Sequence, residues 1–418
     1  MKGVLKSIFV VGLVFGCFMF GYSWRDLQNL QAPSSRALNS LLGVKTAPTA
    51  SPEKVFSSNY GRILADYYRP VKSTELKYAA MEGLMASLGD PHTIFMPPRA
   101  AQAFNDETRA NFFGVGARLA ADQGGAMATT VFEDGPAYAS GLRNGDLITG
   151  VNGKSVGGMD IDKIVALIKG KENTTVRLSI LKKGKDKPVE ITITRRKVTV
   201  PTVESKFLPD SGVGYISVAT FSEPTAAQFD QAIAKLEQNP KLKGIVIDLR
   251  GNPGGLLQTA VDMLGRFVDD KLVVKMKFRD GREEVANTDS GRVHRFNYPV
   301  VALINEDSAS AAEIFAGCLK DYGKATLVGE HSYGKASVQN VFQLVDQSSA
   351  KITIAHYYLP STPYYGRKVD EDGVFISGGL EPSVKVDLDM DADPEIGNPK
   401  SDNQLAKAIE VVLEKSHE

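Results

Sequence analysis

Cysteine and net charge are both scarce in this sequence. Its 418 residues include only Cys17 and Cys318, and Cys17 lies in an N-terminal apolar run, so we expect no intramolecular disulfide. The 49 basic and 49 acidic residues cancel, which gives no reason to expect a nucleic acid as partner. With 43% hydrophobic and 23% charged residues, the chain has a globular composition and is too long for one ordinary domain.

The sequence also lacks the histidine arrangement of common serine hydrolases. Its five histidines (His92, His294, His331, His356 and His417) are scattered, and no G-x-S-x-G elbow occurs. A serine nucleophile would therefore need another base. A lysine can serve when burial lowers its pKa from about 10.4 toward neutrality.

Residues 305–339 (NEDSASAAEIFAGCLKDYGKATLVGEHSYGKASVQ) contain the parts for such chemistry. The apolar run PVVALI before them predicts a buried strand, and Asp307 and Ser308 predict the N-cap of a helix over residues 309–319. Ser310 is then expected in the first turn, where free N–H groups and the helix dipole favour negative charge. Taken alone, this pattern also fits an ordinary capped helix.

Lys335 and Gln339 are the candidate base and its partner, since a glutamine can accept a hydrogen bond from the lysine and fix its direction. In a straight strand the two residues would lie about 13 Å apart, whereas one helical turn would bring them to roughly 6 Å. Contact between them therefore requires a helical turn or a sharp bend after Gly334.

These motifs resemble the signature of the C-terminal processing proteases, also called tail-specific proteases, a Ser-Lys serine peptidase family. The resemblance rests on SASAAE followed by GKASVQ, and extends to LGDPHTIFM, GYISVATF, GIVIDLRGNPGG and the closing YYLPS…GGLEPSVKV, in the family's order, over residues 55–388. It implies a mixed α/β protease core of the ClpP/crotonase-like type within a multidomain α+β chain.

The resemblance also implies roles for individual residues. Ser310 becomes the nucleophile, Lys335 the general base and Gln339 its orienting partner. The oxyanion hole combines the N–H of Ala311 with one from GNPGG, either Gly254 or Gly255, because glycine lets a loop turn its amide toward an oxyanion.

Residues 112–198 resemble a PDZ domain. FFGVGARL resembles its carboxylate-binding loop, with amides from Phe113, Gly114, Val115 and Gly116, and apolar spacing predicts a helix over residues 160–169. Such a domain adds an extended peptide to a sheet edge, so the partners implied are protein substrates with unstructured C-terminal tails. Its place between the helical segment and the protease core also allows it to gate the active site.

Two other motifs compete with this interpretation. GEHSYGKA fits the first seven positions of a P-loop, but Ala336 replaces the hydroxyl residue that binds magnesium, so nucleotide binding is a remote alternative. DLDMDADPE imitates a calcium loop but has Ala392 at the glycine position, and a solvated acidic segment accounts for it better. We therefore expect no metal and no cofactor. The main alternative is a catalytically inert PDZ scaffold or adaptor.

The N-terminus follows a signal-sequence pattern. Lys2 and Lys6 precede an apolar run over residues 8–22, and no small-x-small cleavage site follows it. We favour an uncleaved signal anchor, with a lipoprotein at Cys17 or cleaved export as alternatives. The bulk of the chain would then be exported, to the periplasmic side of a bacterial inner membrane or an equivalent space.

The expected organisation has six parts: signal anchor (1–25), stalk (26–54), helical segment (55–111), PDZ domain (112–198), serine peptidase core (199–388), and an acidic linker with a C-terminal helix (389–418). The last helix either caps the core or joins subunits into a homo-oligomer. The predicted function is a serine endopeptidase that cleaves exported proteins at their C-terminal tails, with an adaptor protein as a further expected partner. The resemblance gives no physiological substrate.

Overall fold

The computed structural model describes residues 51–371 and 373–416, and the chain divides into two compact units, residues 1–79 and 80–418. The predicted anchor and most of the stalk lie outside the described residues. Helix α3 (Pro52–Asp66) begins after the N-cap Ser51. Helix α4 (Ser73–Ala86) follows a break that contains Pro70, because proline disrupts a continuing helix. None of the helices described is long and apolar enough to span a bilayer.

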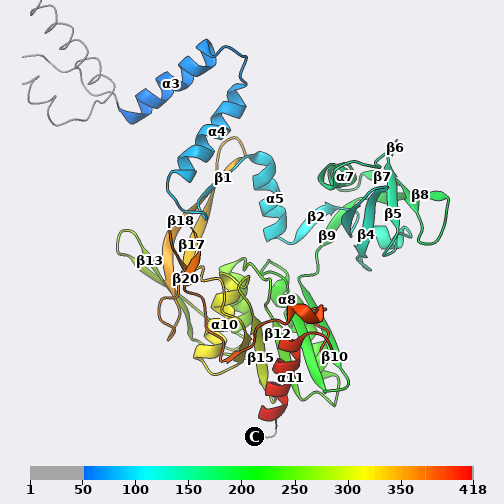
Figure 1. Ribbon diagram of the computed structural model, residues 1–418, viewed down its shortest axis with the longest axis vertical. Coiled ribbons are helices and arrows are strands. Elements are labelled where there is room, and N and C mark those ends of the chain that lie inside the picture. The colour runs from blue at the N-terminus through cyan, green and yellow to red at the C-terminus, as the bar shows by residue number, and fades with distance from the viewer. Residues whose placement is uncertain (1–50, 372, 417–418) are drawn as a thin grey trace, which may run out of the picture. The chain divides into compact units, whose positions relative to one another are not determined.

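Residues 111–199 form a β-module (Figure 1). Its antiparallel sheet has the order β3-β4-β5-β7-β8, with β6 on β5, and β2 pairs with β9 in a separate ribbon. Helix α7 begins after Asp160, whose side chain accepts a hydrogen bond from the Asp162 N–H. The bounds are β2 (Asn111–Gly114), β3 (Ala117–Asp122), β4 (Gly125–Val131), α6 (Pro136–Ala139), β5 (Leu147–Val151), β6 (Lys154–Ser155), α7 (Ile161–Ile168), β7 (Thr175–Leu181), β8 (Pro188–Thr194) and β9 (Arg196–Thr199).

A six-stranded sheet forms the centre of the following part, in the order β10-β11-β12-β15-β16-β21. β10 is antiparallel to β11 and the other pairs are parallel. The central strands β12 and β15 are buried at every residue, as expected for parallel strands covered on both faces. The bounds are β10 (Val203–Leu208), β11 (Val213–Val218), β12 (Gly244–Asp248), β15 (Val300–Ile304), β16 (Thr326–Gly329) and β21 (Val384–Lys385).

Helices cover both faces of this sheet. On one face α8 (Thr225–Glu237), α9 (Leu257–Leu264) and α10 (Ala311–Asp321) pack into the main core around Phe229 and Phe315. On the other face α11 (Asn403–Lys415) packs its apolar side against β12, β15 and β16. The C-terminal helix therefore packs on the core, and its other expected role, joining subunits, stays a prediction.

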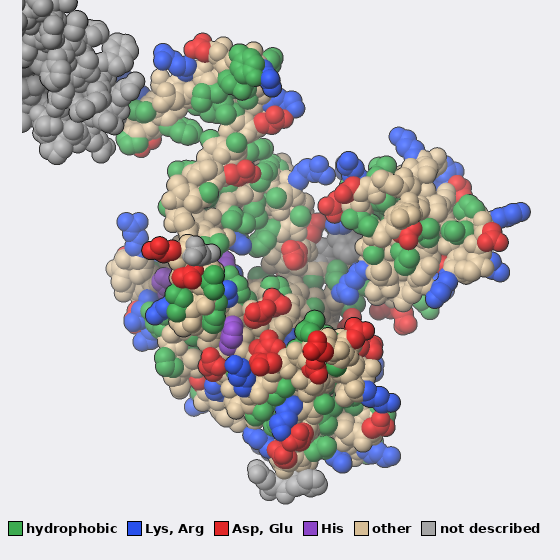
Figure 2. Space-filling model, in the orientation of Figure 1, with side chains coloured by type: hydrophobic (Ala, Val, Ile, Leu, Met, Phe, Trp, Pro, Cys, Tyr) green, Lys and Arg blue, Asp and Glu red, His purple; other side chains and the backbone are tan. Residues whose placement is uncertain are grey.

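A second, antiparallel sheet has the order β1-β18-β13-β14, with β17 also on β18. Its bounds are β1 (Ile94–Met96), β13 (Leu272–Phe278), β14 (Glu283–Asn287), β17 (Ser337–Gln343) and β18 (Ser349–Tyr358). The remaining elements are α5 (Pro98–Thr108), β19 (Lys368–Val369), β20 (Phe375–Ser377) and the short helix η1 (Met390–Ala392). On the face seen in Figure 2, acidic and basic side chains are interspersed, in keeping with the balanced composition.

Candidate active site

The six predicted core site residues line one cavity of about 440 Å³ in the unit 80–418. They come from the loop after β12, the start of α10, and the approach to β17. The predicted residues are Ser310, Ala311, Gly254, Gly255, Lys335 and Gln339. Segments far apart in the sequence therefore meet where β12 and β15 end, which is where parallel α/β sheets commonly place their sites.

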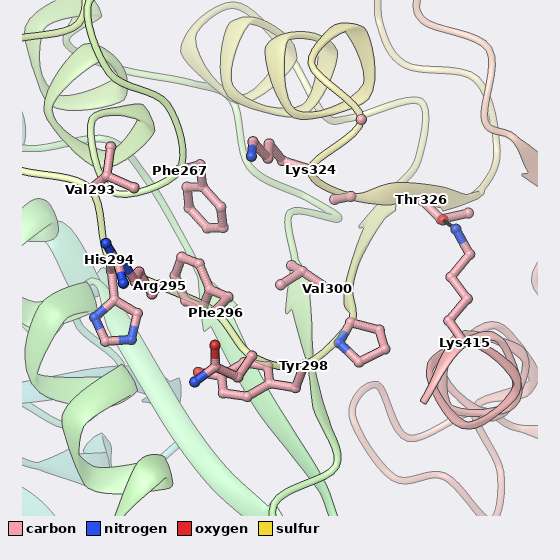
Figure 3. A pocket seen from close by; sticks show the side chains of 14 residues that line it. Phe267, Val293, His294, Arg295, Phe296, Tyr298, Val300, Lys324, Thr326 and Lys415 are labelled. Carbon is pink, nitrogen blue, oxygen red and sulfur yellow. Dashed lines mark hydrogen bonds between the residues drawn. The ribbon is translucent and has the colours of Figure 1, made fainter. Parts of the chain in front are cut away.

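A larger cavity of about 600 Å³ lies elsewhere (Figure 3). It is lined by residues 293–300, 323–326 and Lys415, and includes none of the predicted site residues. Val300 and Thr326, which line it, begin β15 and β16, so it lies at the opposite edge of the sheet from Ser310. Size alone therefore does not locate the chemistry.

Ser310 has a strained backbone, with φ 55° and ψ −116°. A non-glycine residue rarely adopts such a conformation, and strain of this kind gathers at functional sites. The structure corrects the predicted helix start, because Ser310 is the N-cap of α10 and Ala311 the first helical residue. Ser308 is not the cap. Its Oγ donates to the Leu249 carbonyl, 2.8 Å away, which anchors the turn to the end of β12.

Glu313 holds the segment that contains Ser310 and the segment that contains Lys335 together. Its fully buried carboxylate accepts hydrogen bonds from the backbone N–H groups of Ser310 at 2.8 Å, Gly334 at 2.6 Å and Lys335 at 2.9 Å. The Ser332 hydroxyl also donates to it, at 2.5 Å. Burial raises the pKa of Glu313, and these hydrogen bonds oppose the rise.

Tyr357 makes a second link between the same two segments. Its hydroxyl donates to the Lys335 carbonyl and lies 3.4 Å from the Ser310 carbonyl. The Tyr365 hydroxyl donates to it in turn, at 2.7 Å. Since both tyrosines are buried, this chain of hydroxyls fixes the distance between the two backbones.

A buried ion network supports the loop that contains Gly254 and Gly255. Arg250 pairs with Asp248 at 2.6 Å and with Asp402 at 2.7 Å, and all three side chains are at most 4% exposed. Asp402 is the N-cap of α11, so the network joins the end of β12 to the C-terminal helix. Removing one member of such a network leaves an uncompensated buried charge.

The two loop glycines have different surroundings. The Gly254 N–H donates to Asn252 Oδ1 at 2.8 Å, and a Cβ on Gly254 would lie 2.7 Å from the Ser310 Cβ. Within the described part of the chain, the N–H groups of Gly255 and Ala311 have no hydrogen-bond acceptor. Glycine at 254 thus permits close approach to Ser310, while two free amides line the cavity nearby.

Lys335 is half-buried in the cavity wall. Burial lowers its pKa, and the Lys351 ammonium lowers it further, while the Glu313 and Asp90 carboxylates raise it. Among the described residues the Lys335 amine forms no hydrogen bond, either to Ser310 or to Gln339. The structure therefore places these three side chains in one cavity without closing a hydrogen-bonded triad.

Gln339 lies in strand β17 rather than in a helical turn. The register between β17 and β18 shifts between Val338 and Gln339, where Ile354 of β18 is the extra residue, and Gly334 before β17 has a positive φ of 88°. The Gln339 amide nitrogen donates to the hydroxyls of Ser337 at 2.9 Å and Thr353 at 3.1 Å. Its amide oxygen is thereby left to accept a hydrogen bond.

The β-module has an open sheet edge at β3, the first strand in its order, and α7 contacts β3. The predicted carboxylate loop precedes this strand: Phe113 and Gly114 belong to β2, and Val115 and Gly116 lead into β3. Gly116 has φ 83°, and a Cβ there would lie 3.0 Å from Gly135 Cα. The helix predicted over residues 160–169 agrees with α7 and its two caps.

The competing motifs lack structural support. The P-loop-like segment leads from β16 into strand β17, whereas a P-loop is followed by a helix. The acidic segment after β21 forms the exposed helix η1. Among the described residues, no group of three or more His, Cys, Asp or Glu side chains is arranged to hold a metal ion.

Several supporting residues are absent from the sequence predictions. Ser310-x-x-Glu313 is a capping-box pattern, so a sequence signal for Glu313 was present. Tyr357, Lys351 and the partners of Arg250 carry no such signal, because their contacts join segments far apart in the chain.

The sequence model of peptidase family S41 matches residues 212–375, and that of the PDZ domain matches residues 127–182. The carboxy-terminal processing protease CtpA of Bacillus subtilis (strain 168) is 34% identical over 352 residues, 84% of this chain and 72% of that protein. CtpB of the same bacterium is 31% identical over 378 residues, 89% and 76% of the two chains. The solved structure of a putative S41 protease from Bacteroides fragilis NCTC 9343 covers 84% of this chain and 91% of its own, at 18% identity and a TM-score of 0.51, and shows the fold alone.

This chain belongs to the carboxy-terminal processing proteases of peptidase family S41, with a PDZ domain beside the protease core. The family resemblance, the enzyme class and the mixed α/β architecture predicted from the sequence are thus confirmed, and the protein is a hydrolase.

Proposed function

We propose that the protein cleaves the C-terminal tails of exported proteins by a Ser-Lys mechanism. The observation that carries the proposal is the single cavity shared by a strained Ser310, a half-buried Lys335 and two unpaired backbone N–H groups. We further propose the six-part division of the chain and the ClpP/crotonase-like type of its protease core, as predicted from the sequence.

In the first step the neutral Lys335 amine takes the Ser310 hydroxyl proton while Oγ attacks the scissile carbonyl carbon. The carbonyl electron pair moves to oxygen, and the oxyanion accepts hydrogen bonds from the N–H groups of Ala311 and Gly255. We choose Gly255 rather than Gly254 as the second oxyanion donor because the Gly255 N–H is free, whereas the Gly254 N–H already donates to Asn252. The amide oxygen of Gln339 accepts a hydrogen bond from the lysine and directs it.

Collapse of this intermediate breaks the peptide bond, and the Lys335 ammonium gives its proton to the leaving amine. The acyl group is then an ester on Ser310. Lys335, neutral again, takes a proton from water, and the hydroxide attacks the ester carbon to give a second tetrahedral intermediate. Its collapse breaks the bond between the acyl carbon and Ser310 Oγ, and the Lys335 ammonium returns its proton to that oxygen. The products are a new C-terminal carboxylate, after loss of the acid proton to solvent, and free Ser310. Apolar groups on the cavity wall, including Val274, Ile314 and Val338, favour an apolar side chain at the cleaved residue.

The PDZ domain supplies substrate recognition in this proposal. A tail extends the sheet at the open edge of β3, its carboxylate binds the loop amides of residues 113–116, and its apolar end packs beside α7. Full-length protein with Ser310→Ala should bind a free-acid tail peptide at least about tenfold more tightly than the same peptide with an amidated C-terminus. Equal binding of the two would refute carboxylate recognition.

Export and anchoring through residues 1–25 belong to the same proposal, as do an adaptor protein and self-association. Export and anchoring are supported by the N-terminal sequence pattern, and the adaptor and self-association by the resemblance to the family.

The nucleophile can be tested directly with a serine-reactive phosphonate. We expect a single label, mapped by peptide mass spectrometry to Ser310, that disappears in Ser310→Ala. Ser308→Ala is the matched control, because Ser308 is fully buried and its hydroxyl is bonded to Leu249. Labelling that persists in Ser310→Ala would overturn the assignment.

A further inference from the structure

A second lysine, Lys351, lines the same cavity as Ser310 and Lys335. It lies on strand β18. Tyr357 of the same strand also lines the cavity, and Thr353 between them accepts a hydrogen bond from Gln339. Strand β18 therefore brings to the cavity Lys351, the support for Gln339 and the tyrosine that bridges the backbones of Ser310 and Lys335.

Two carboxylates oppose the effect of burial on Lys351. Lys351 lies opposite Ile94 of β1, and the turn before β1 contains Asp90. That turn is bonded to β18, since the Thr353 N–H donates to Thr93 Oγ1 at 3.0 Å and the Thr93 hydroxyl donates to Asp90 at 2.6 Å. Glu107 also lines the cavity, and the Lys351 Nζ lies 5.6 Å from the centre of the Phe104 ring. Burial lowers the pKa of Lys351 overall, and the Asp90 and Glu107 carboxylates offset part of that change.

Lys335 differs from Lys351 in that a neighbouring cation, as well as burial, lowers its pKa. Glu313 accepts from the Lys335 backbone N–H, and its carboxylate is already shared among four donors. Asp90 attracts the Lys335 ammonium, whereas the Lys351 ammonium repels it. His92 is the remaining titratable neighbour, and burial followed by repulsion from Lys335 lowers its pKa, which favours the neutral ring. When one proton leaves this pair of amines, it therefore leaves Lys335.

We propose that the Lys351 ammonium keeps the Lys335 amine neutral and so ready to accept the Ser310 proton. This inference rests on the Ser-Lys mechanism proposed above. Lys351 is a positioning residue in this scheme, since it acts through Lys335 and forms no bond with the substrate. A cation beside a nucleophilic or basic lysine is an established way to make that lysine basic at neutral pH.

The test is the pH dependence of kcat/KM for a tail substrate, measured on the full-length protein with wild-type, Lys351→Met, Lys351→Gln and Lys351→Arg. Methionine keeps the length of the side chain and removes its charge, whereas arginine keeps the charge. The control is Lys277→Met, because Lys277 lies on β13 of the same sheet, outside this cavity, and pairs with Glu283. The rate of Ser310 labelling by the phosphonate against pH gives a second readout that needs no substrate.

Removal of the charge should move the acidic limb of the profile to higher pH. At pH 7 the methionine and glutamine variants should lose at least about threefold in kcat/KM and labelling rate, with recovery toward the wild-type plateau in alkali. Lys351→Arg and Lys277→Met should keep the wild-type limb. The proposal is overturned if folded Lys351→Met or Lys351→Gln has the same pH profile of kcat/KM as wild type. It is also overturned if either variant loses kcat/KM by the same factor at every pH.

Failure of the Ser-Lys mechanism itself would give different results from failure of the role proposed for Lys351. If Lys335→Ala keeps full activity, or if Ser310 is never labelled, the Ser-Lys chemistry itself is wrong and the role of Lys351 falls with it. If Lys335→Ala is inactive while Lys351→Met has the wild-type profile, only the role of Lys351 is wrong.

Discussion

At the scale of single residues, the geometry around Ser310 depends on groups that neither make nor break bonds. Gly254 leaves room for the Ser310 side chain, and Asn252 accepts a hydrogen bond from the Gly254 N–H. Glu313 and Tyr357 bind backbone groups of both the Ser310 and the Lys335 segments. Displacements of about 1 Å in such supports can cost on the order of 100-fold in rate.

Gly254→Ala should therefore abolish most activity. The new Cβ would lie 2.6 Å from the Ala309 carbonyl and 2.7 Å from the Ser310 Cβ, at a backbone φ of 97°. We expect a fall in kcat/KM of at least about 100-fold. Gly251→Ala is the control in the same loop, since its φ is 69° but nothing lies within 4 Å of the added Cβ. If both variants retained activity within about threefold, close packing of the loop on Ser310 would not matter for catalysis.

Glu313→Gln should lose both stability and activity. The carboxylate now accepts hydrogen bonds from N–H and O–H donors, and the new amide NH₂ group is itself a donor that cannot accept them. We therefore expect the free energy of unfolding to fall by about 3 kcal/mol. Urea unfolding and kcat/KM measure the two effects. Glu306→Gln, an exposed change in the loop before Ser308, should alter neither. A stable, fully active Glu313→Gln protein would contradict the bridging role.

At the scale of elements, the C-terminal helix α11 supports the GNPGG loop from the far face of the sheet. Asp402 caps the helix and binds Arg250, so the helix start and the GNPGG loop depend on one buried carboxylate. Burial raises the pKa of Asp402, but Arg250 and the N–H groups of Gly397 and Leu405 outweigh it, and the net change is downward.

Asp402→Asn should lower the free energy of unfolding by about 3 kcal/mol, because it leaves Arg250 only partly compensated. Since the pKa of Asp402 is lower in the folded state, its stabilisation is present above about pH 4 and is lost as the pH falls through the folded value. The variant should lack this part of the acid dependence in urea titrations between pH 2 and pH 7. Asp393→Asn, at an exposed left-handed residue nearby, serves as control. Equal stability of the two variants would contradict the network.

The elements also show how far sequence reasoning reaches. The buried strand β15, the following helix and the PDZ helix were predictable because apolar spacing and cap residues are local signals. The start of α10 was misplaced, because Ser308 bonds to Leu249 on another strand rather than capping the helix. The conformation around Lys335 was left open, and the register shift beside Gln339 arises from an extra residue in the partner strand β18. The Arg250 network joins residues 248 and 402, which no local pattern connects.

At the scale of the whole molecule, recognition and cleavage belong to separate parts of the chain. The open edge of β3 lies in the PDZ domain, and the cavity with Ser310 lies in the protease core. Both lie outside residues 1–25, to which the sequence pattern assigns membrane anchoring.

A protein that begins at Gln31 should therefore be released from membranes and keep its catalytic constants. Sedimentation of membranes from cells that produce either form should bring down the full-length chain only. Assays of the two proteins on one tail substrate should give kcat/KM values within about twofold. Sedimentation of the shortened chain with membranes, to the same extent as the full-length chain, would contradict the anchor.

The most direct test of the central claim is product analysis by mass spectrometry. The full-length chain would be mixed with a protein that has a disordered, apolar C-terminal tail, in parallel with Ser310→Ala, Lys335→Ala and the control Lys320→Ala, whose lysine lies on the outer side of α10. We predict that wild type and Lys320→Ala release tail fragments, and that the other two variants release none although they remain folded. Undiminished cleavage by Ser310→Ala or Lys335→Ala would contradict the Ser-Lys mechanism.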